Sequence, residues 1–139
     1  MRRRALLGAV AAVSVAGCID RLTSGSDRIQ GGDIGMSAHS FIPEEYHTTV
    51  GETVTWINSS SRGHTVTAYD DKIPADASFF STGEYESTAE AVAAWHEYGG
   101  GRIDVGETFS HTFEVPGTYE YFCEPHVLGG MIGRVIVDE

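Results

Sequence analysis

The sequence predicts an all-β fold, a sandwich of short strands connected by turns. From residue 34 onward apolar and polar residues alternate, which is typical of strands that bury one face. Turn-forming Gly, Pro and Asn separate the alternating runs, and the chain holds 17 Gly residues. With 139 residues the chain is long enough for one domain with a sizeable core, and it leaves little room for a second.

The strand pattern occurs in several segments, and turn signals lie between them. The expected strands are residues 51–58 after an initial turn, 64–68, 108–113, 119–122 and 133–137. Residues 87–96 contain helix-forming residues instead, with Ser87 as an N-cap and Glu90 three residues later. We interpret this stretch as a short helix inside an excursion over residues 71–101, which decorates the sandwich without forming a second domain.

Residues 1–17 are expected to be a signal peptide. Arg2, Arg3 and Arg4 precede an apolar run that ends at Gly17, and this run is too short to span a bilayer as a helix. The arginine-rich start resembles a twin-arginine export signal, and a Sec signal with a basic start is the alternative.

Cys18 follows the apolar run in the sequence Val15-Ala16-Gly17-Cys18, which resembles the lipobox of exported lipoproteins. We therefore expect lipid attachment at Cys18, and the alternative is a free cysteine that is discarded with the signal. Residues 18–33 are polar and rich in Gly and Ser, which predicts a flexible tether. Residues 34–139 would then form a domain held at the outer face of the cell membrane.

The charge of the chain is strongly negative, with 9 basic and 20 acidic residues and a formal charge of −11. Removal of Arg2–Arg4 would leave 6 basic against 20 acidic residues, a formal charge of −14. Such a surface repels nucleic acid, which excludes a DNA- or RNA-binding role. The acidity, with Lys72 as the single lysine, resembles the surfaces of proteins from salt-loving organisms.

A candidate metal site lies near the C-terminal end of the sequence, after the strand expected at 119–122. Cys123, His126 and Met131 supply a thiolate, an imidazole and a thioether within one short loop. These soft or borderline ligands suit copper that cycles between Cu(I) and Cu(II), and a type 1 site needs two His, one Cys and a weak axial Met. A Cys123 thiolate that binds metal is not free for a disulfide with Cys18.

One further histidine is needed for this site. His64 is our candidate because it opens a strand directly after the loop over residues 58–63. We interpret the remaining histidines as ordinary structural or surface residues of strands and of the predicted helix: His39, His47, His96 and His111.

Four segments resemble plastocyanin-type cupredoxins: residues 51–58, 63–66, 117–126 and 131–135. The acidity, the lipobox and the arginine-rich signal make the chain most similar to halocyanins, the small blue copper proteins of haloarchaea. This resemblance implies a Greek-key cupredoxin β-sandwich of eight strands. It implies one type 1 copper near one end, bound by His64, Cys123, His126 and Met131.

The resemblance also implies that the backbone amide of Thr65 supports the sulfur of Cys123. Many relatives carry an asparagine at the position of Thr65, so the side-chain link between the two ligand loops is not carried over.

The expected function is that of a monomeric single-electron carrier, not an enzyme. Membrane-bound redox complexes would be its donor and acceptor, docking near His126 beside Val127, Leu128 and Ile132. A copper-binding protein for metal storage or delivery is the alternative, although the Met-rich and Cys-x-x-Cys motifs of such proteins are missing. The His-x-His pairs of a multicopper oxidase are also missing from the sequence, and a structural zinc site rarely includes Met.

Overall fold

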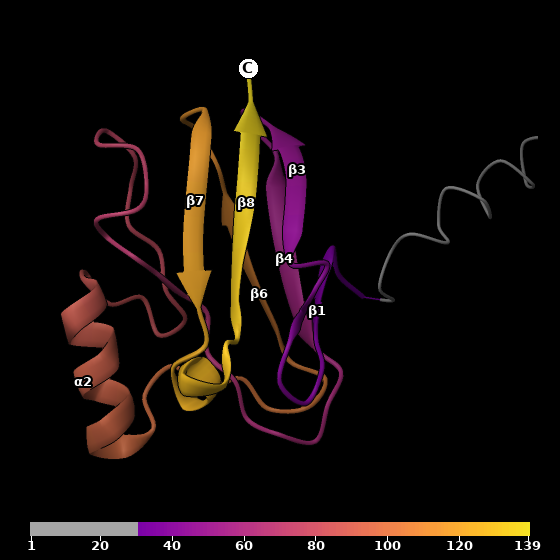
Figure 1. The fold of residues 1–139 in the computed structure, drawn as a ribbon, viewed down its shortest axis with the longest axis vertical. Helices are drawn as coiled ribbons and strands as arrows, with labels where there is room; N and C mark the ends of the chain where they lie inside the picture. Colours follow the sequence, from indigo (N-terminus) through magenta and orange to yellow (C-terminus); the bar gives the residue numbers. More distant parts are fainter. Residues whose placement is uncertain (1–30) are drawn as a thin grey trace, which may run out of the picture.

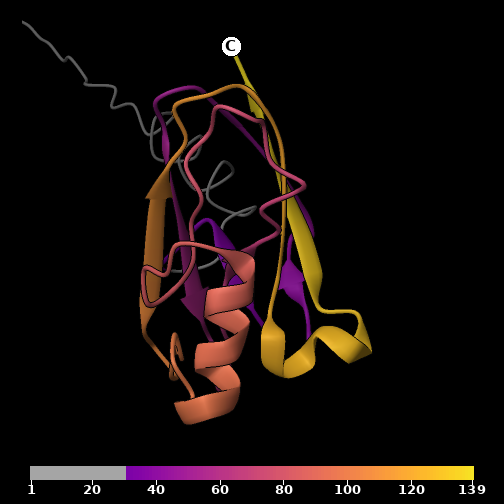
Figure 2. The ribbon, with the colours of Figure 1, turned by 90° about the vertical axis from the view of Figure 1, so that its left-hand side faces the viewer.

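The computed structural model describes residues 31–139, so the predicted signal peptide, Cys18 and most of the predicted tether lie outside the described residues. Within residues 31–139, eight strands form two four-stranded sheets that face each other (Figures 1 and 2). The first sheet has the order β2 (Phe41–Ile42), β1 (Ile34–Met36), β4 (Thr53–Asn58), β6 (Thr108–Thr112). The second has the order β3 (Glu45–Thr49), β8 (Ile132–Asp138), β7 (Gly117–Phe122), β5 (Thr67–Ala68). The predicted all-β sandwich is confirmed.

The strand pairing is mixed in both sheets. β1 runs parallel to β4 and β3 runs parallel to β8, while the other neighbouring strands are antiparallel. The alternation seen in the sequence sets the faces: in β4, Val54, Trp56 and Asn58 are buried, and the two residues between them are half-buried.

An aromatic cluster fills the space between the sheets. The Trp56 ring contacts the rings of Phe80, Phe109, Phe113 and Tyr121 at centroid distances of 5.4–6.5 Å. Tyr121 in β7 lies opposite Gly133 in β8. A Cβ atom at Gly133 would come within 2.6 Å of the Tyr121 hydroxyl, so this close approach requires glycine.

The predicted helix is confirmed as α2 (Thr88–Tyr98), which ends two residues beyond the predicted stretch. The Ser87 side chain caps it by accepting a hydrogen bond from the Glu90 amide at 3.1 Å. The Glu90 carboxylate accepts from the amide of Glu86 at 2.8 Å, one residue before the cap. No helix within the described part of the chain is long and apolar enough to cross a membrane.

The strand predicted over residues 64–68 is shorter in the structure. Only Thr67 and Ala68 form β5, and His64 makes a single bridge to Ile103. The pairing with β7 stops there, because Thr67 lies opposite Phe122, the last residue of β7. Residues 80–82 of the excursion pair with the same segment, through hydrogen bonds from the Ala68 amide to the Phe80 carbonyl and from the Thr82 amide to the Val66 carbonyl. The excursion therefore covers the outer edge of β5 as well as carrying α2.

Candidate metal centre

The structure brings three of the four predicted ligands together at one end of the sandwich. One ligand atom each from His64, Cys123 and His126 lie within 4.8 Å of one another. The Cys123 Sγ and His64 Nδ1 atoms are 3.4 Å apart. His64 and Cys123 are fully buried, whereas His126 is half-buried. In Figure 1 this end is marked by η1 (Glu124–Gly129), the yellow coil between β7 and β8.

The loop from Cys123 to Met131 closes the β7–β8 hairpin and is tied by its own backbone. The Cys123 amide donates to the Met131 carbonyl at 3.0 Å, and the Met131 amide donates to the His126 carbonyl at 3.3 Å. The His126 amide donates in turn to the Cys123 carbonyl at 3.1 Å. Met131 itself is buried, with 1% of its surface exposed. These bonds hold the three sequence-predicted loop ligands in one compact turn.

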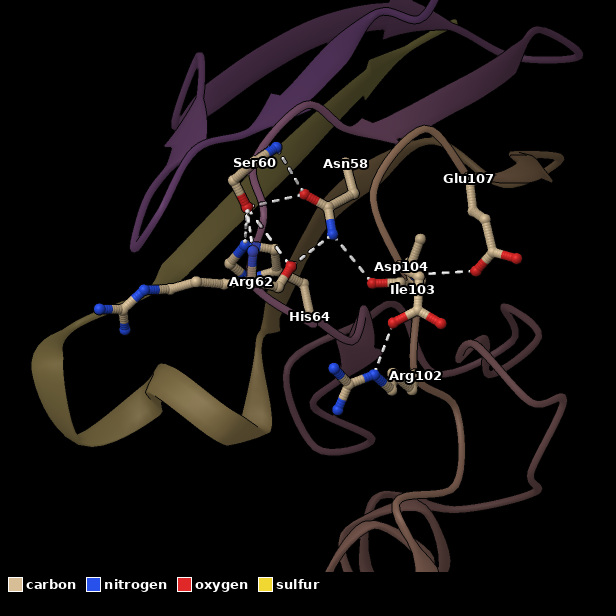
Figure 3. Close-up of polar contacts among 8 residues, drawn as sticks. All are labelled: Asn58, Ser60, Arg62, His64, Arg102, Ile103, Asp104 and Glu107. Carbon is tan, nitrogen blue, oxygen red and sulfur yellow. Dashed lines mark hydrogen bonds and ion pairs between the residues drawn. The ribbon is translucent and has the colours of Figure 1, made fainter.

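The loop before His64 is shaped by Asn58, the last residue of β4 (Figure 3). Its buried side-chain amide donates to the carbonyls of Arg62 at 2.6 Å and of Ile103 at 2.9 Å. Its carbonyl oxygen accepts from the amide of Ser60 at 2.9 Å and from the Ser60 hydroxyl at 2.8 Å. The Ser60 hydroxyl lies 3.0 Å from His64 Nε2. With Nε2 engaged by Ser60, the Nδ1 atom of His64 is the one that faces Cys123.

Thr65 connects the two ligand loops through two hydrogen bonds. Its backbone amide lies 3.4 Å from Cys123 Sγ, as the sequence resemblance implied. Its side-chain hydroxyl accepts from the Glu124 amide at 2.9 Å. The threonine therefore provides a side-chain link between the loops even though it replaces the asparagine of many relatives.

Burial sets the protonation of the cluster in the metal-free protein. It lowers the pKa of His64 to about 4, with a further decrease from the charge of His126. It also lowers the pKa of His126. Burial raises the pKa of Cys123 to about 11, against hydrogen bonds from Thr65 and His126 that favour the thiolate. At neutral pH both imidazoles are thus neutral and ready to coordinate, while the thiol must lose a proton when metal binds.

The residues present fit a bound metal ion. The Nε2 atom of His126 is buried and has no hydrogen-bond partner among the described residues. A buried polar atom without a partner is costly unless a ligand satisfies it. A sulfur and two imidazoles with a buried thioether nearby form the donor set that suits copper.

The other described histidines lie outside this cluster, as predicted. His39 is exposed, His47 lies 2.9 Å from Glu45, and His111 in β6 stacks on the Phe80 ring at 4.5 Å. His96 on α2 has a contact that the sequence did not indicate: its Nε2 atom lies 2.6 Å from the carboxylate of Glu124.

The sequence prediction missed the roles of Asn58 and Ser60 in positioning His64. The sequence Asn58-Ser59-Ser60 signals a turn in which the first side chain bonds the backbone two residues later. The sequence therefore indicates this turn. It does not indicate the hydrogen bond between Ser60 and His64, or the long-range hydrogen bond from Asn58 to Ile103.

A β-sandwich with Cys and two His converging at one end is the architecture of the cupredoxins, the type 1 copper proteins. The comparisons agree: residues 31–138 match the family described as copper binding proteins of the plastocyanin/azurin family. This chain belongs to that family, whose members carry electrons and are not enzymes.

Similar proteins include two plastocyanins and one amicyanin. The chloroplastic plastocyanin of Hordeum vulgare is 32% identical over 138 residues, covering 98% of this chain and 77% of that protein. The plastocyanin of Solanum tuberosum is 36% identical over 114 residues, covering 81% of this chain and 99% of that protein. The crystal structure of amicyanin from Paracoccus versutus aligns with a TM-score of 0.53 at 25% identity, covering 82% of this chain and 88% of that one.

Proposed function

We propose that this protein is a single-electron carrier that works at the outer face of the cell membrane. In this proposal His64, Cys123, His126 and Met131 bind one type 1 copper, which accepts and releases an electron between Cu(II) and Cu(I). The observation that carries the proposal is the convergence of the His64, Cys123 and His126 ligand atoms within 4.8 Å in a buried site. Membership of an electron-carrier family supports it.

The surroundings of the site favour electron exchange over metal exchange. His64 is fixed by Ser60, and the Cys123 loop is fixed by Thr65 and by its own backbone, so the ligands have little freedom to rearrange. A ligand set that moves little between oxidation states keeps the reorganisation energy small. Copper storage or delivery, the alternative, would be better served by an exposed and exchangeable site than by fully buried Cys123 and His64.

The test is the optical and EPR spectrum of the protein after addition of Cu(II). We expect an intense blue thiolate-to-copper band and narrow copper hyperfine splitting, both lost in Cys123→Ser. The Met131→Gln variant should keep the blue band with a lower reduction potential, because a harder axial oxygen replaces the thioether. A pale spectrum with wide splitting in the unaltered protein would contradict the type 1 assignment and favour storage or delivery.

The location is proposed from the sequence of the first 33 residues. We infer that residues 1–17 are a signal peptide, that Cys18 carries lipid and that residues 18–33 tether the copper domain over residues 34–139. Halocyanins are the group that this combination resembles. The check is cell fractionation: the unaltered protein should sediment with membranes, and Cys18→Ala should move it to the soluble fraction.

The proposed partners are membrane-bound redox complexes that dock near His126. The chain presents exposed apolar side chains close to this ligand in sequence, because Leu128 is fully exposed and Ile132 is 41% exposed. Apolar surface at the point where the half-buried His126 approaches solvent would let a partner exclude water and approach the copper closely.

A further inference from the structure

A groove opens beside the copper loop, between that loop and helix α2. It has a volume of about 770 Å³ and is lined by Trp95 and His96 of α2 and by His126, Val127 and Leu128 of η1. Figures 1 and 2 both show α2 and η1 side by side at this end of the molecule. The hydrogen bond between His96 and Glu124 joins the two walls.

The charges of the groove differ from those of the rest of the molecule. Residues 31–139 contain 18 acidic and four basic residues, a formal charge of −14. The groove is lined by a single carboxylate, that of Glu124, which is bonded to His96 and only 14% exposed. Arg62 is the groove's other charged residue and is exposed. The side chains that line the groove therefore carry no net negative charge, although the domain as a whole is strongly acidic.

The guanidinium of Arg62 is available to a partner. It makes no ion pair with any residue of the described range, whereas Arg102 and Arg134 pair with Asp104 and Glu45. Figure 3 shows the Arg62 side chain pointing away from the cluster of Asn58, Ser60 and His64. Its charge is close enough to the copper site to lower the pKa of both His64 and His126, although burial is the larger cause in each.

We propose that this groove docks a redox protein that presents a carboxylate to Arg62 and apolar side chains to the wall formed by Val127 and Leu128. The proposal rests on the electron-carrier function above and specifies its partner. An arginine can bind a carboxylate through two parallel hydrogen bonds, and its weak hydration makes it suited to an interface. Where the docked partner shields this pair from solvent, salt screens it less than the long-range field of the acidic surface.

The experiment measures electron transfer from the reduced, copper-loaded full chain to two forms of one acceptor. The probes are ferric cytochrome c, which is basic, and the same protein with its lysines succinylated, which surrounds its haem edge with carboxylates. In each reaction one electron leaves Cu(I) and reduces the haem iron from Fe(III) to Fe(II). The measured quantity is the second-order rate constant with the succinylated form divided by that with the unmodified form, because this ratio cancels any change in the reduction potential.

We expect Arg62→Gln to lower this ratio about fivefold, as for loss of one partly exposed ion pair. The matched control is Lys72→Gln, which removes a second exposed cation that has no ion pair among the described residues. Lys72 lies outside the groove, and its backbone carbonyl accepts a hydrogen bond from the Glu120 amide of β7. Because both variants change the net charge equally, Lys72→Gln should lower the ratio by no more than about 1.5-fold. Arg62→Lys should recover part of the loss.

Three results would overturn the docking proposal while leaving the carrier function intact. These are equal ratios for Arg62→Gln and the unaltered protein, equal effects of Arg62→Gln and Lys72→Gln, or an unaltered protein that reduces only the unmodified cytochrome. If the unaltered protein forms no blue copper site or reduces neither cytochrome, the carrier function itself is refuted and the docking proposal with it.

Discussion

The Ser60 hydroxyl determines which nitrogen of the His64 imidazole is directed at Cys123. Its hydroxyl lies 3.0 Å from Nε2 of His64, and Asn58 holds that hydroxyl in turn at 2.8 Å. A partner on the outer nitrogen fixes the orientation and tautomer of a metal-binding histidine. The chain Asn58–Ser60–His64 thus makes the geometry of a ligand depend on a residue that ends a β-strand six positions earlier.

Loss of this hydroxyl should weaken metal binding. In Ser60→Ala we expect copper affinity to fall by about 10- to 100-fold, because the Nε2 atom of His64 loses its partner and the ring is free to turn. Competition with a copper chelator measures the change. The control is Ser61→Ala in the same loop, whose side chain is exposed and makes no hydrogen bond within residues 31–139. Equal affinities of the two variants would contradict this role of Ser60.

The pKa values of the ligands predict one proton released for each copper bound near neutral pH. The Cys123 pKa is raised to about 11, so the thiol is protonated below that pH and must lose its proton to bind. The His64 pKa is lowered to about 4 and that of His126 is also lowered, so both imidazoles are already neutral and release nothing. Copper affinity should therefore rise about tenfold per pH unit from about pH 7 to about pH 10, where both imidazoles are neutral and the Cys123 thiol is protonated.

A pH-stat titration with copper counts these protons directly. Release of about one proton per copper is the expected value, and Cys123→Ser should release about none. Two protons would mean that a histidine is charged in the metal-free protein, and no release from the unaltered protein would mean that Cys123 is already a thiolate. Either result would contradict the effect that burial has on these groups.

Helix α2 supports the copper loop from outside the sandwich. The bond from His96 to Glu124 joins the helix to η1 immediately after Cys123. A second pair of bonds joins the start of the helix to the end of β5, where the amide of Thr88 donates to the Asp70 carboxylate at 2.9 Å and its hydroxyl donates to the Ala68 carbonyl at 2.8 Å. The helix is thereby fixed at both ends, against the sheet and against the metal loop.

Removal of the link between α2 and η1 should loosen the copper loop without unfolding the sandwich. In metal-free His96→Ala we expect hydrogen exchange of the amides of residue 124 and residues 126–130 to quicken by up to about fivefold, since one side-chain hydrogen bond contributes about 1 kcal/mol. His96→Gln, which keeps a donor, should exchange more slowly than His96→Ala. Glu97→Ala on the same helix is the control and should leave these amides unchanged. Faster exchange across β4 and β8 would instead indicate a general loss of stability.

Local patterns in the sequence were sufficient to predict helix α2 and five of the eight strands in residues 31–139, because each depends on neighbouring residues, whereas β1, β2 and β3 were not among the predicted strands. Alternation predicted β4 and β8, the Ser87 cap predicted α2, and the spacing of Cys123, His126 and Met131 predicted the metal loop. The links between elements were not predictable in this way. The bond of His96 to Glu124 spans 28 positions and that of Asn58 to Ile103 spans 45, and periodicity shows only that a face is buried, not what covers it.

The shortening of β5 has the same origin. Residues 64–68 do alternate, but β7 ends at Phe122 opposite Thr67, so the residues before Thr67 have no partner in β7 and His64 makes a single bridge to Ile103. Because His64 lies outside a continuous strand, the direction of its side chain is not fixed by the alternation of a sheet, and its ring lies against Cys123. The structure therefore departs from the predicted strand at His64, one of the proposed copper ligands.

The charge of the whole molecule opposes its own folding at low salt. Residues 31–139 have a formal charge of −14 and contain four cations. Of these cations only Arg102 and Arg134 form ion pairs with carboxylates among the same residues, so most carboxylates have no compensating charge. The mutual repulsion of these groups is greater in the compact state than in the unfolded chain, because unfolding separates them. Salt reduces the repulsion, since the Debye length falls from about 10 Å at 0.1 M to about 3 Å at 1 M.

We therefore expect the free energy of unfolding of the metal-free protein to rise with NaCl over this range, by on the order of 1–2 kcal/mol. Urea titrations at both concentrations measure it, with NaCl chosen because sulfate strengthens apolar burial by a separate effect. The control neutralises exposed carboxylates that form no ion pair within the described range, as Glu→Gln at Glu84, Glu97, Glu114 and Glu139. This variant should be more stable at low salt and gain less from added salt. A stability that does not change with NaCl, or an equal gain in both proteins, would show that salt acts through apolar burial and not through the acidic surface.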